Sequence, residues 1–458
     1  MKRILTIALV MLAASVSVAA TEKPRGTSAP MPESLKSRLW SATVDGQEVG
    51  IIRARTVDSP WNLRSRNDHG GEYAVALLEM SGAVRFVARP IVVRPHVKRD
   101  LSRTRVLPED APVRIVSRNA DEIVLEIARP CKFSLEPDGE NSPLVVLARA
   151  PMKDLPNLSS PKTRVVGPGI VEPKGCRIEL GEGETLYLKP GTVLKAGIVA
   201  RGKNVRVCGH GVIDGSDFPH GRDPTPSVVW LLGCRGARVD GITVVGGWQW
   251  NVIPWGSEDV RIEDVAICGS RVWNDDGINV VNSRRVVVRD CFVRTDDDCF
   301  CMKGCDIRNG DCTDVTVEDC VFWCDRARIV LLGWVESYTD NMSRLTFRNN
   351  RVIRFRGPVF TCSPLLNCKM ENILFENVTI YNDRDKVSEP VIRVWPRVKA
   401  NHARSKFGTV DGVTFRDIRF VGVPAELTAR LKDDPQHPPQ NVSLENVTAF
   451  GSPLKEMR

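Results

Sequence analysis

The chain has 458 residues, with 64 Lys and Arg against 56 Asp and Glu, so its formal net charge is +8. Hydrophobic residues make up 42% and charged residues 26%, a balance that excludes a disordered chain, a collagen-like repeat and a polytopic membrane protein. The mild positive charge favours an acidic partner, either a polyanionic polysaccharide or a nucleic acid, without deciding between them.

Residues 1–20 have the pattern of a secretory signal peptide. Lys2 and Arg3 form a basic start, an apolar stretch runs from Ile4 to Ser15, and Val18-Ala19-Ala20 supplies a small-residue cleavage site. No later segment offers the roughly twenty apolar residues of a membrane anchor. We therefore expect an exported protein, periplasmic, extracellular or at the cell surface, without a membrane span.

Residues 35–150 alternate strand-like runs with turn signals. The run from Glu72 to Leu78 is typical of the former, and Asp45-Gly46 of the latter. No repeat is visible in this segment. The pattern predicts a small antiparallel β-sandwich domain, joined to the C-terminal part of the chain by the proline-containing stretch 152–164.

A short phrase recurs along the rest of the chain: apolar, any residue, apolar, charged, and then Asp, Asn or Gly. Its last residues are Gly209, Gly241, Asp264, Asp290, Asp319, Asn349, Asn377, Asp417 and Asn446. The steps between them are 32, 23, 26, 29, 30, 28, 40 and 29 residues, shorter in most cases than the roughly 40–50 residues of a propeller blade. Units this small bury their apolar face only by stacking, so residues 165–455 are predicted to form a parallel β-helix.

The cysteines are concentrated in the repeats. Twelve of the fourteen lie between Cys208 and Cys368, and no C-x-x-C pair occurs among them. Zinc binding is therefore not expected, and neither a metal nor a cofactor is predicted. In an exported chain this composition suggests buried thiols together with a few disulfides.

An acidic cluster is the sharpest chemical signal. Asn274-Asp275-Asp276-Gly277 precedes one strand-like run, and Asp296-Asp297-Asp298 precedes the next. Aligning the two runs places Asp276 against Asp298, one coil apart, where neighbouring strands are about 4.8 Å from each other. Crowded carboxylates raise one another's pKa, which suits a general acid working beside an ionised base.

The flanking coils supply candidate substrate-binding residues. Trp248 and Trp250 come from the preceding coil, and Arg326 and Arg328 from the following one. An indole face stacks on a sugar ring, and arginine pairs with a carboxylate. Each has an ordinary alternative: the tryptophans as core residues, and the arginines, like Lys303, as neutralising partners of the aspartates.

The sequence gives little support to a histidine-based catalytic mechanism or to nucleic-acid binding. None of the six histidines lies near the aspartate segments in sequence, which weakens a histidine-based mechanism. The basic residues are dispersed, with no arginine-rich arm, so nucleic-acid binding is not expected.

At these residues the chain resembles the polygalacturonase family, glycoside hydrolase family 28. The similarity runs from about Val205 to Gly333 and includes four phrases: Gly211-Val-Ile-Asp-Gly215, Trp250-Asn-Val, Asn274-Asp-Asp-Gly277 in place of N-T-D-G, and Asp297-Asp-Cys-Phe-Cys-Met-Lys303 in place of D-D-C-I-A-I-K. The resemblance implies a right-handed parallel β-helix, Asp297 as general acid, and Asp276 and Asp298 activating the attacking water for hydrolysis with inversion. The matching positions make Asn274 and Lys303 candidate substrate-binding residues.

The chain departs from that family at two places. No histidine stands near Arg328-Ile329, where the family's H-G phrase would fall, and the R-I-K phrase has no counterpart. The order of a β domain followed by a β-helix also resembles dextranases and isopullulanase, glycoside hydrolase family 49.

The sequence thus predicts an exported, polygalacturonase-like glycoside hydrolase whose substrate is a polysaccharide or oligosaccharide, with anionic glycans among the candidates. A dextranase-type α-glucan hydrolase is one alternative. The others are a polysaccharide lyase and a non-catalytic carbohydrate-binding β-helix protein. Calcium held by the aspartates would support the lyase.

Overall fold

The computed structural model describes residues 25–56, 71–91, 101–137, 139, 143–398, 406–431 and 437–457. The predicted signal peptide at 1–20 lies outside these ranges. The described residues form β-strands and short 3-10 turns, the latter at Glu33–Leu35, Leu101–Arg103, Lys174–Cys176 and Ile307–Asn309. Among them, no helix has both the length and the apolar composition needed to cross a membrane.

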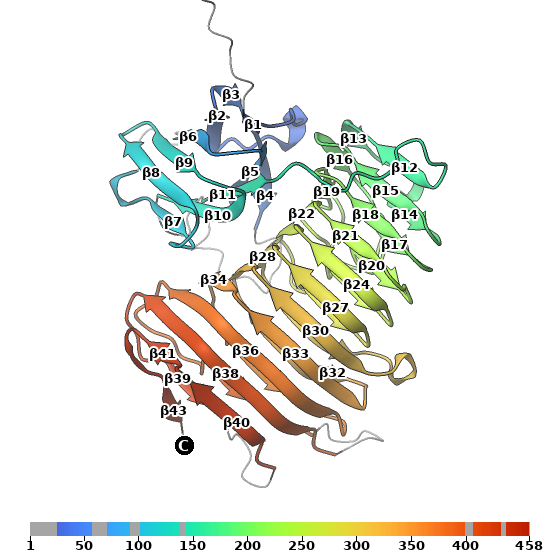
Figure 1. The fold of residues 1–458 in the computed structure, drawn as a ribbon, viewed down its shortest axis with the longest axis vertical. Coiled ribbons are helices and arrows are strands. Elements are labelled where there is room, and N and C mark those ends of the chain that lie inside the picture. Colours follow the sequence, from blue (N-terminus) through green and yellow to red (C-terminus); the bar gives the residue numbers. More distant parts are fainter. Residues whose placement is uncertain are drawn as a thin grey trace, which may run out of the picture.

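The N-terminal part is a sandwich of two sheets enclosing one apolar core (Figure 1). One sheet contains β1 (Gly26–Thr27), β4 (Gly50–Arg55), β5 (Glu72–Met80), β7 (Arg105–Leu107), β10 (Cys131–Glu136) and β11 (Leu144–Arg149). The other contains β2 (Trp40–Val44), β3 (Gln47–Glu48), β6 (Val84–Pro90), β8 (Val113–Arg118) and β9 (Ile123–Ile127). The predicted sandwich is confirmed, with the difference that β5 and β11 run parallel.

The rest of the described chain is a solenoid of stacked coils with three parallel faces, which confirms the predicted β-helix (Figure 1). The first face comprises β12 (Thr163–Val166), β15 (Thr185–Leu188), β18 (Arg206–Cys208), β21 (Arg238–Asp240), β24 (Glu258–Glu263), β27 (Arg284–Arg289), β30 (Cys312–Glu318), β33 (Asn341–Arg348), the starts of β36 (Lys369–Asn382) and β38 (Thr409–Gly422), and β40 (Gln440–Glu445). The second face comprises β13 (Gly169–Val171), β16 (Thr192–Leu194), β19 (Val212–Asp214), β22 (Thr243–Val245), β25 (Ala266–Cys268), β28 (Phe292–Thr295), β31 (Val321–Cys324), β34 (Arg351–Arg354), the ends of β36 and β38, and β41 (Thr448–Ala449), which a short β42 (Ser452–Pro453) joins antiparallel.

The third face carries the strands that follow the two acidic segments. It comprises β14 (Arg177–Leu180), β17 (Gly197–Ala200), β20 (Val229–Leu232), β23 (Val252–Trp255), β26 (Ile278–Val281), β29 (Phe300–Gly304), β32 (Val330–Ser337), β35 (Phe360–Ser363), β37 (Ile392–Val394), β39 (Thr428–Arg430) and β43 (Lys455–Met457).

The recurrent Asp, Asn or Gly of the sequence phrase makes the corner between the first and second faces. Every one of the nine has a positive φ, from +50° at Asp290 and Asn377 to +112° at Gly209. This left-handed conformation is open to glycine and tolerated by Asn and Asp, whereas β-branched residues avoid it. The repeat in the sequence is therefore a repeat of one backbone turn.

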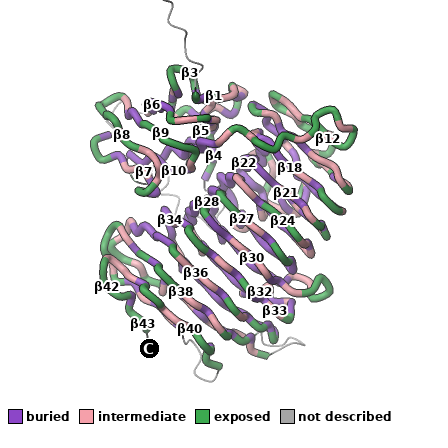
Figure 2. The backbone as a smooth tube through the Cα atoms, viewed as in Figure 1, coloured by how far each residue is buried: buried purple, intermediate pink, exposed green. Residues whose placement is uncertain are grey.

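Buried residues run along the interior of the coils (Figure 2), and most of them are apolar. Val286, Val315, Leu345 and Ile373 stack on successive strands of the first face and are at most 1% exposed. Each strand alternates such inward residues with outward polar ones, as period-two patterning requires. The outward positions are therefore the ones that do not build this core.

All fourteen cysteines are free thiols in the structure, so the prediction of a few disulfides is wrong here. Most occupy buried positions in or next to strands, where a thiol packs as a small hydrophobe. Cys291 and Cys320, for example, stack on adjacent coils, and the Cys291 amide lies 3.3 Å from the Cys320 sulfur.

The sandwich packs against the second face of the solenoid. Tyr73 and Val75 of β5 share an apolar cluster with Phe292 of β28 and Trp323 of β31. Buried ion pairs cross the same interface, among them Lys132 with Asp264 at 2.8 Å. Because the sandwich covers the second face, it leaves the third face open.

Candidate functional site

The predicted pairing of the two acidic segments is observed. Ile278 of β26 is in register with Phe300 of β29, which places Asp276 beside Asp298 just before the strands of the third face begin. The Gly277 amide donates to the Asp298 carbonyl oxygen at 2.9 Å. A Cβ at Gly277 would stand 2.3 Å from another carbonyl oxygen, so the close approach of the two coils requires glycine there.

Asp276 is buried and paired with a cation. Its Oδ2 accepts hydrogen bonds from Lys303 Nζ at 2.8 Å and from Asn279 Nδ2 at 3.1 Å, while Oδ1 has no partner among the described residues. Burial raises the pKa of Asp276, and Lys303 opposes that rise. Burial works against the charge of Lys303 as well, but Asp276 outweighs it and the lysine pKa is raised well above its ordinary value. Lys303 is therefore the counter-ion of Asp276 in this buried pair.

Asp298 lies one coil further along. Its Oδ1 accepts the Arg328 amide at 3.0 Å and the Arg328 guanidinium at 3.3 Å. Burial, followed by the neighbouring Asp297, raises the pKa of Asp298 to about 7, and Arg328 opposes the shift. Asp298 therefore exchanges its proton near neutral pH.

Asp297 is the more exposed of the three. Its Oδ2 lies 3.3 Å from the Asn274 backbone amide and 3.3 Å from the Arg326 guanidinium, and its Oδ1 accepts the Asp298 amide at 3.0 Å. Asn274 adopts a φ of +70°, a left-handed turn that Asn tolerates. Two of the predicted substrate-binding residues, Asn274 and Arg326, therefore contact the Asp297 carboxylate directly.

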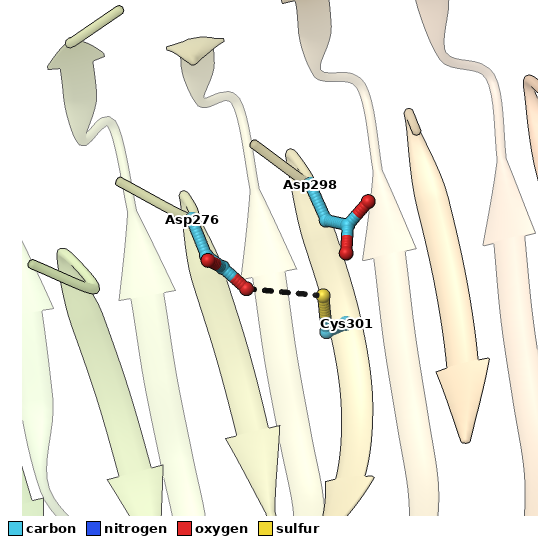
Figure 3. A group of neighbouring side chains, drawn as sticks. All are labelled: Asp276, Asp298 and Cys301. Atoms are coloured by element: carbon cyan, nitrogen blue, oxygen red, sulfur yellow. Dashed lines mark hydrogen bonds between the residues drawn. The ribbon is translucent and has the colours of Figure 1, made fainter. Parts of the chain in front are cut away.

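Asp276, Asp298 and Cys301 converge on one small volume (Figure 3). One oxygen of each carboxylate and the Cys301 sulfur lie within 4.8 Å of one another. A water molecule making hydrogen bonds of about 2.7 Å to both carboxylates fits this spacing. A metal ion fits less well, since the Lys303 ammonium already neutralises Asp276 from 2.8 Å and a thiol is a poor partner for hard cations such as calcium.

Two further aspartates are structural. Asp275 is buried and accepts the backbone amides of Ser270, Asp296 and Asp297, which fixes the turn that carries Asp297. Burial, together with Asp296, raises the pKa of Asp275 well above its ordinary value. Asp296 is paired with Arg326 at 2.6 Å.

The aspartates form one wall of a cavity of about 310 Å³. Of the predicted substrate-binding residues, the cavity is lined by Asn274, Trp250, Lys303, Arg326 and Arg328. The Lys303 ammonium lies 4.0 Å from the centre of the Trp250 ring. These side chains come from four successive coils, as the alignment of the repeats predicts.

Trp248 is not part of this cavity, so its prediction as a substrate-binding residue is wrong. Its side chain is fully buried in the solenoid core, edge-on to Phe218 with ring centroids 4.9 Å apart. Its Nε1 donates to the Thr225 carbonyl oxygen at 2.9 Å. Trp248 and Trp250 lie in the turn before β23, where the alternation of a strand no longer places residues i and i+2 on one side.

Sequence reasoning missed Trp273, Leu331, Trp334 and Glu336, which also line the cavity. Trp334 and Glu336 reach it through a bulge in β32: Met302 pairs with Leu332 and Gly304 with Ser337, so extra residues of β32 face Lys303. Trp334 has a φ of +67°, a strained conformation for a bulky residue. Bulges of this kind re-aim side chains next to active sites.

The cavity continues toward the N-terminal coils. A second hollow of about 590 Å³ shares Trp250, Asn274 and Glu336 with the first and is lined in addition by Trp230 and Trp255. The rings of Trp230 and Trp255 stand edge-to-face, 6.1 Å apart. A groove with aromatic walls therefore runs across several coils on both sides of Asp276, which is the shape that an extended chain of sugars requires.

Known proteins share parts of this sequence and fold. No family model matches the chain. It is 21% identical over 240 residues to exopolygalacturonase X-1 of Emericella nidulans, and the match covers 48% of this chain and 47% of that protein. The chain thus spans about half the length of the curated relative that it matches. Among solved structures, Dex49A from Penicillium minioluteum aligns with a TM-score of 0.57 at 14% identity, covering 93% of this chain and 91% of that one. An exopolygalacturonase from Thermotoga maritima aligns with a TM-score of 0.49 at 18% identity, covering 63% of this chain and 84% of that one.

The likeness to Dex49A extends over nearly the whole chain and shows a shared fold. The resemblance to polygalacturonases that the motifs indicated is confirmed by the sequence match to exopolygalacturonase X-1.

Proposed function

We propose that this chain is an exported glycoside hydrolase that cleaves a polysaccharide with inversion, using Asp276, Asp297 and Asp298. The observation that carries the proposal is the clustering of these carboxylates. Asp276, paired with Lys303 at 2.8 Å, and Asp298 are close enough to share one water in a groove that is also lined by aromatic side chains. The solenoid, 165–455 in the predicted division, would be the catalytic domain, with the sandwich at 35–150 supporting it.

The roles follow from geometry and resemblance together. Asp297 donates its proton to the leaving glycosidic oxygen as that carbon–oxygen bond breaks. A water held by Asp276 and Asp298 forms the new bond from the opposite face of the sugar and gives its proton to one of these carboxylates. The Asp276–Lys303 pair keeps one base charged before substrate binds. Trp250 stacks on a neighbouring sugar.

The same observations bear on the alternatives. A calcium-dependent lyase needs a cation among the carboxylates, and the Lys303 ammonium at 2.8 Å from Asp276 already takes that place. The likeness to Dex49A keeps α-glucans beside galacturonans as substrates to be tested. A non-catalytic binding protein would keep the groove and lose turnover.

The experiment is a comparison of Asp297→Asn with the wild-type protein on pectins, dextran, pullulan and related glycans, following new reducing ends. We expect the wild type to cleave at least one glycan and Asp297→Asn to be slower by about 10²–10⁴-fold, the usual contribution of a general acid. Asp121→Asn, an exposed aspartate of the sandwich, is the matched control and should keep full activity. Full activity of Asp297→Asn would refute the role, and glycan binding without turnover by the wild type would favour the binding protein.

A further inference from the structure

Arginine and tryptophan side chains alternate in a stack beside the cavity, on the side of the C-terminal coils. Arg328 lies over the Trp334 ring at 4.4 Å, and Arg397 lies over both Trp334 at 4.2 Å and Trp395 at 4.5 Å. Arg393 lies over Trp395 at 4.1 Å. We call these five residues the arginine–tryptophan stack.

The fold places the stack next to the aspartates. Trp334 is carried by the bulge of β32 and, like Arg328, lines the cavity itself. Arg393 is in register with Thr361 on the third face, at an outward position between two inward, buried residues of β37. Trp395 follows directly, and its amide donates to the Cys362 carbonyl oxygen at 2.7 Å. The stack therefore adjoins the cavity through Arg328 and Trp334 and extends from it along the coils that follow Asp298.

Arg397 lacks an anionic partner among the described residues. It forms no ion pair with any of them, and its Nη1 is buried without a hydrogen-bond acceptor. Burial, and then the positive charges of Arg393 and Arg328, lower the pKa of Arg397. An anion bound here would satisfy the buried donor and relieve the repulsion between the guanidinium groups.

The chemistry of the stack favours a sugar that carries an anion. A guanidinium lying flat on an indole keeps its N–H donors pointing outward in its own plane, where they can pair with two oxygens at once. Exposed indole edges and faces bind the sugar ring itself. A neutral glycan would contact only the indole surfaces and would leave the guanidinium donors without an anion.

We propose that the arginine–tryptophan stack is a subsite for a sugar unit bearing a carboxylate or a sulfate ester, adjacent to the aspartates on their C-terminal side. Its place relative to the cleaved bond rests on the proposed function, whereas the binding itself requires no turnover. Arg397 is the residue that sets this specificity.

The test measures binding in a chain that carries Asp297→Asn, by calorimetric titration with three oligosaccharides of equal length. These are an oligogalacturonate, a sulfated galactan fragment and a neutral galactan fragment. At least one anionic probe should bind at least tenfold more tightly than the neutral one, and the probe that does so identifies the anion. Adding Arg397→Gln should abolish the preference, and Arg397→Lys should retain part of it, because lysine keeps the charge without the planar fork.

Arg416→Gln is the matched control, since Arg416 is an exposed arginine on the first face, paired with Glu376 and Glu445. It should leave all three dissociation constants unchanged. Equal affinity for charged and neutral probes, no binding of either anionic probe, or a preference that survives Arg397→Gln would each overturn the proposal. If Arg397→Gln has a lowered melting temperature, the test rests on Arg397→Lys, whose preference for the anionic probe should be reduced but not lost. A wild-type protein without turnover would refute the proposed function. The tighter binding of the anionic probe is measured independently of turnover and would still test the subsite.

Discussion

Replacing Lys303 by Met should destabilise the protein in a way that depends on pH, because Lys303 is the counter-ion of a buried carboxylate. The side chains of Lys303 and Asp276 are 5% and 2% exposed, and their charged atoms are 2.8 Å apart. Methionine keeps most of the volume of the lysine side chain and removes its charge, so the substitution isolates the ion pair.

The size of the effect follows from that geometry. At an effective dielectric constant of about 20, two unit charges 2.8 Å apart attract by about 6 kcal/mol. Desolvation of both ions offsets part of this attraction, and removing one partner of a buried pair costs about 3–5 kcal/mol. We therefore expect a loss of about 3–5 kcal/mol in the free energy of unfolding at alkaline pH, where Asp276 would have to stay charged.

The loss should shrink in acid. Lys303 lowers the pKa of Asp276 against the effect of burial, so its removal raises that pKa further above the unfolded value. A carboxyl group with a raised pKa in the folded state binds more protons there, and its stability contribution falls as pH rises. Wild type and variant should thus diverge progressively from about pH 5 to about pH 8.

Urea unfolding followed by circular dichroism over this pH range measures the divergence. In an Asp276→Asn background, where Lys303 has already lost its carboxylate partner, Lys303→Met should cost far less. A deficit that is constant with pH, or one that is as large in the Asp276→Asn background, would refute the reasoning.

Four more substitutions separate chemistry from packing. Arg328→Gln should move the acid limb of the kcat/KM profile to higher pH, because Arg328 opposes the burial that raises the pKa of Asp298 to about 7. Trp248→Ala should cost about 3–5 kcal/mol in urea unfolding as a core truncation, whereas Trp250→Ala should raise KM and leave thermal melting unchanged. Gly333→Ala should lower kcat/KM in steady-state assays, since a φ of +85° and a carbonyl oxygen 2.7 Å from the new Cβ disrupt the bulge.

For Arg328→Gln, Trp248→Ala and Gly333→Ala, one result in each case would contradict the expectation. An unmoved acid limb in Arg328→Gln would mean that Asp298 does not titrate in the rate-limiting step. If Trp248→Ala kept normal stability and raised KM, Trp248 would contact the substrate and would not be a core residue. Full activity of Gly333→Ala would show that the bulge is not needed to place Trp334.

The stacking of Asp276 on Asp298 could be predicted because strand register is set by period-two burial. Ile278 and Phe300 both point inward, so aligning them fixes the carboxylates two residues earlier. The corner residues were equally readable, since each turn demands a left-handed residue. Trp248 was misplaced because it lies in a turn, where that alternation does not hold.

Other parts of the site depend on contacts that the repeat does not encode. Trp334 reaches the cavity through an irregularity in β32, and a bulge leaves no clear trace in the hydrophobic pattern. Gly333-Trp334, with glycine in a left-handed conformation, was the one local signal that could have indicated it. Arg397, which lies over Trp334, comes from a segment after β37 in which no repeat phrase occurs.

The configuration of the first sugar end released is the most direct test of the central claim that this chain hydrolyses glycosidic bonds with inversion. Proton NMR of the reaction with the best glycan of the panel, recorded before the anomers equilibrate, measures it. We expect the first reducing end to have the anomeric configuration opposite to that of the bond cleaved, and we expect its signal to be lost in Asp297→Asn. Retention of configuration, or unsaturated ends formed by elimination, would contradict it.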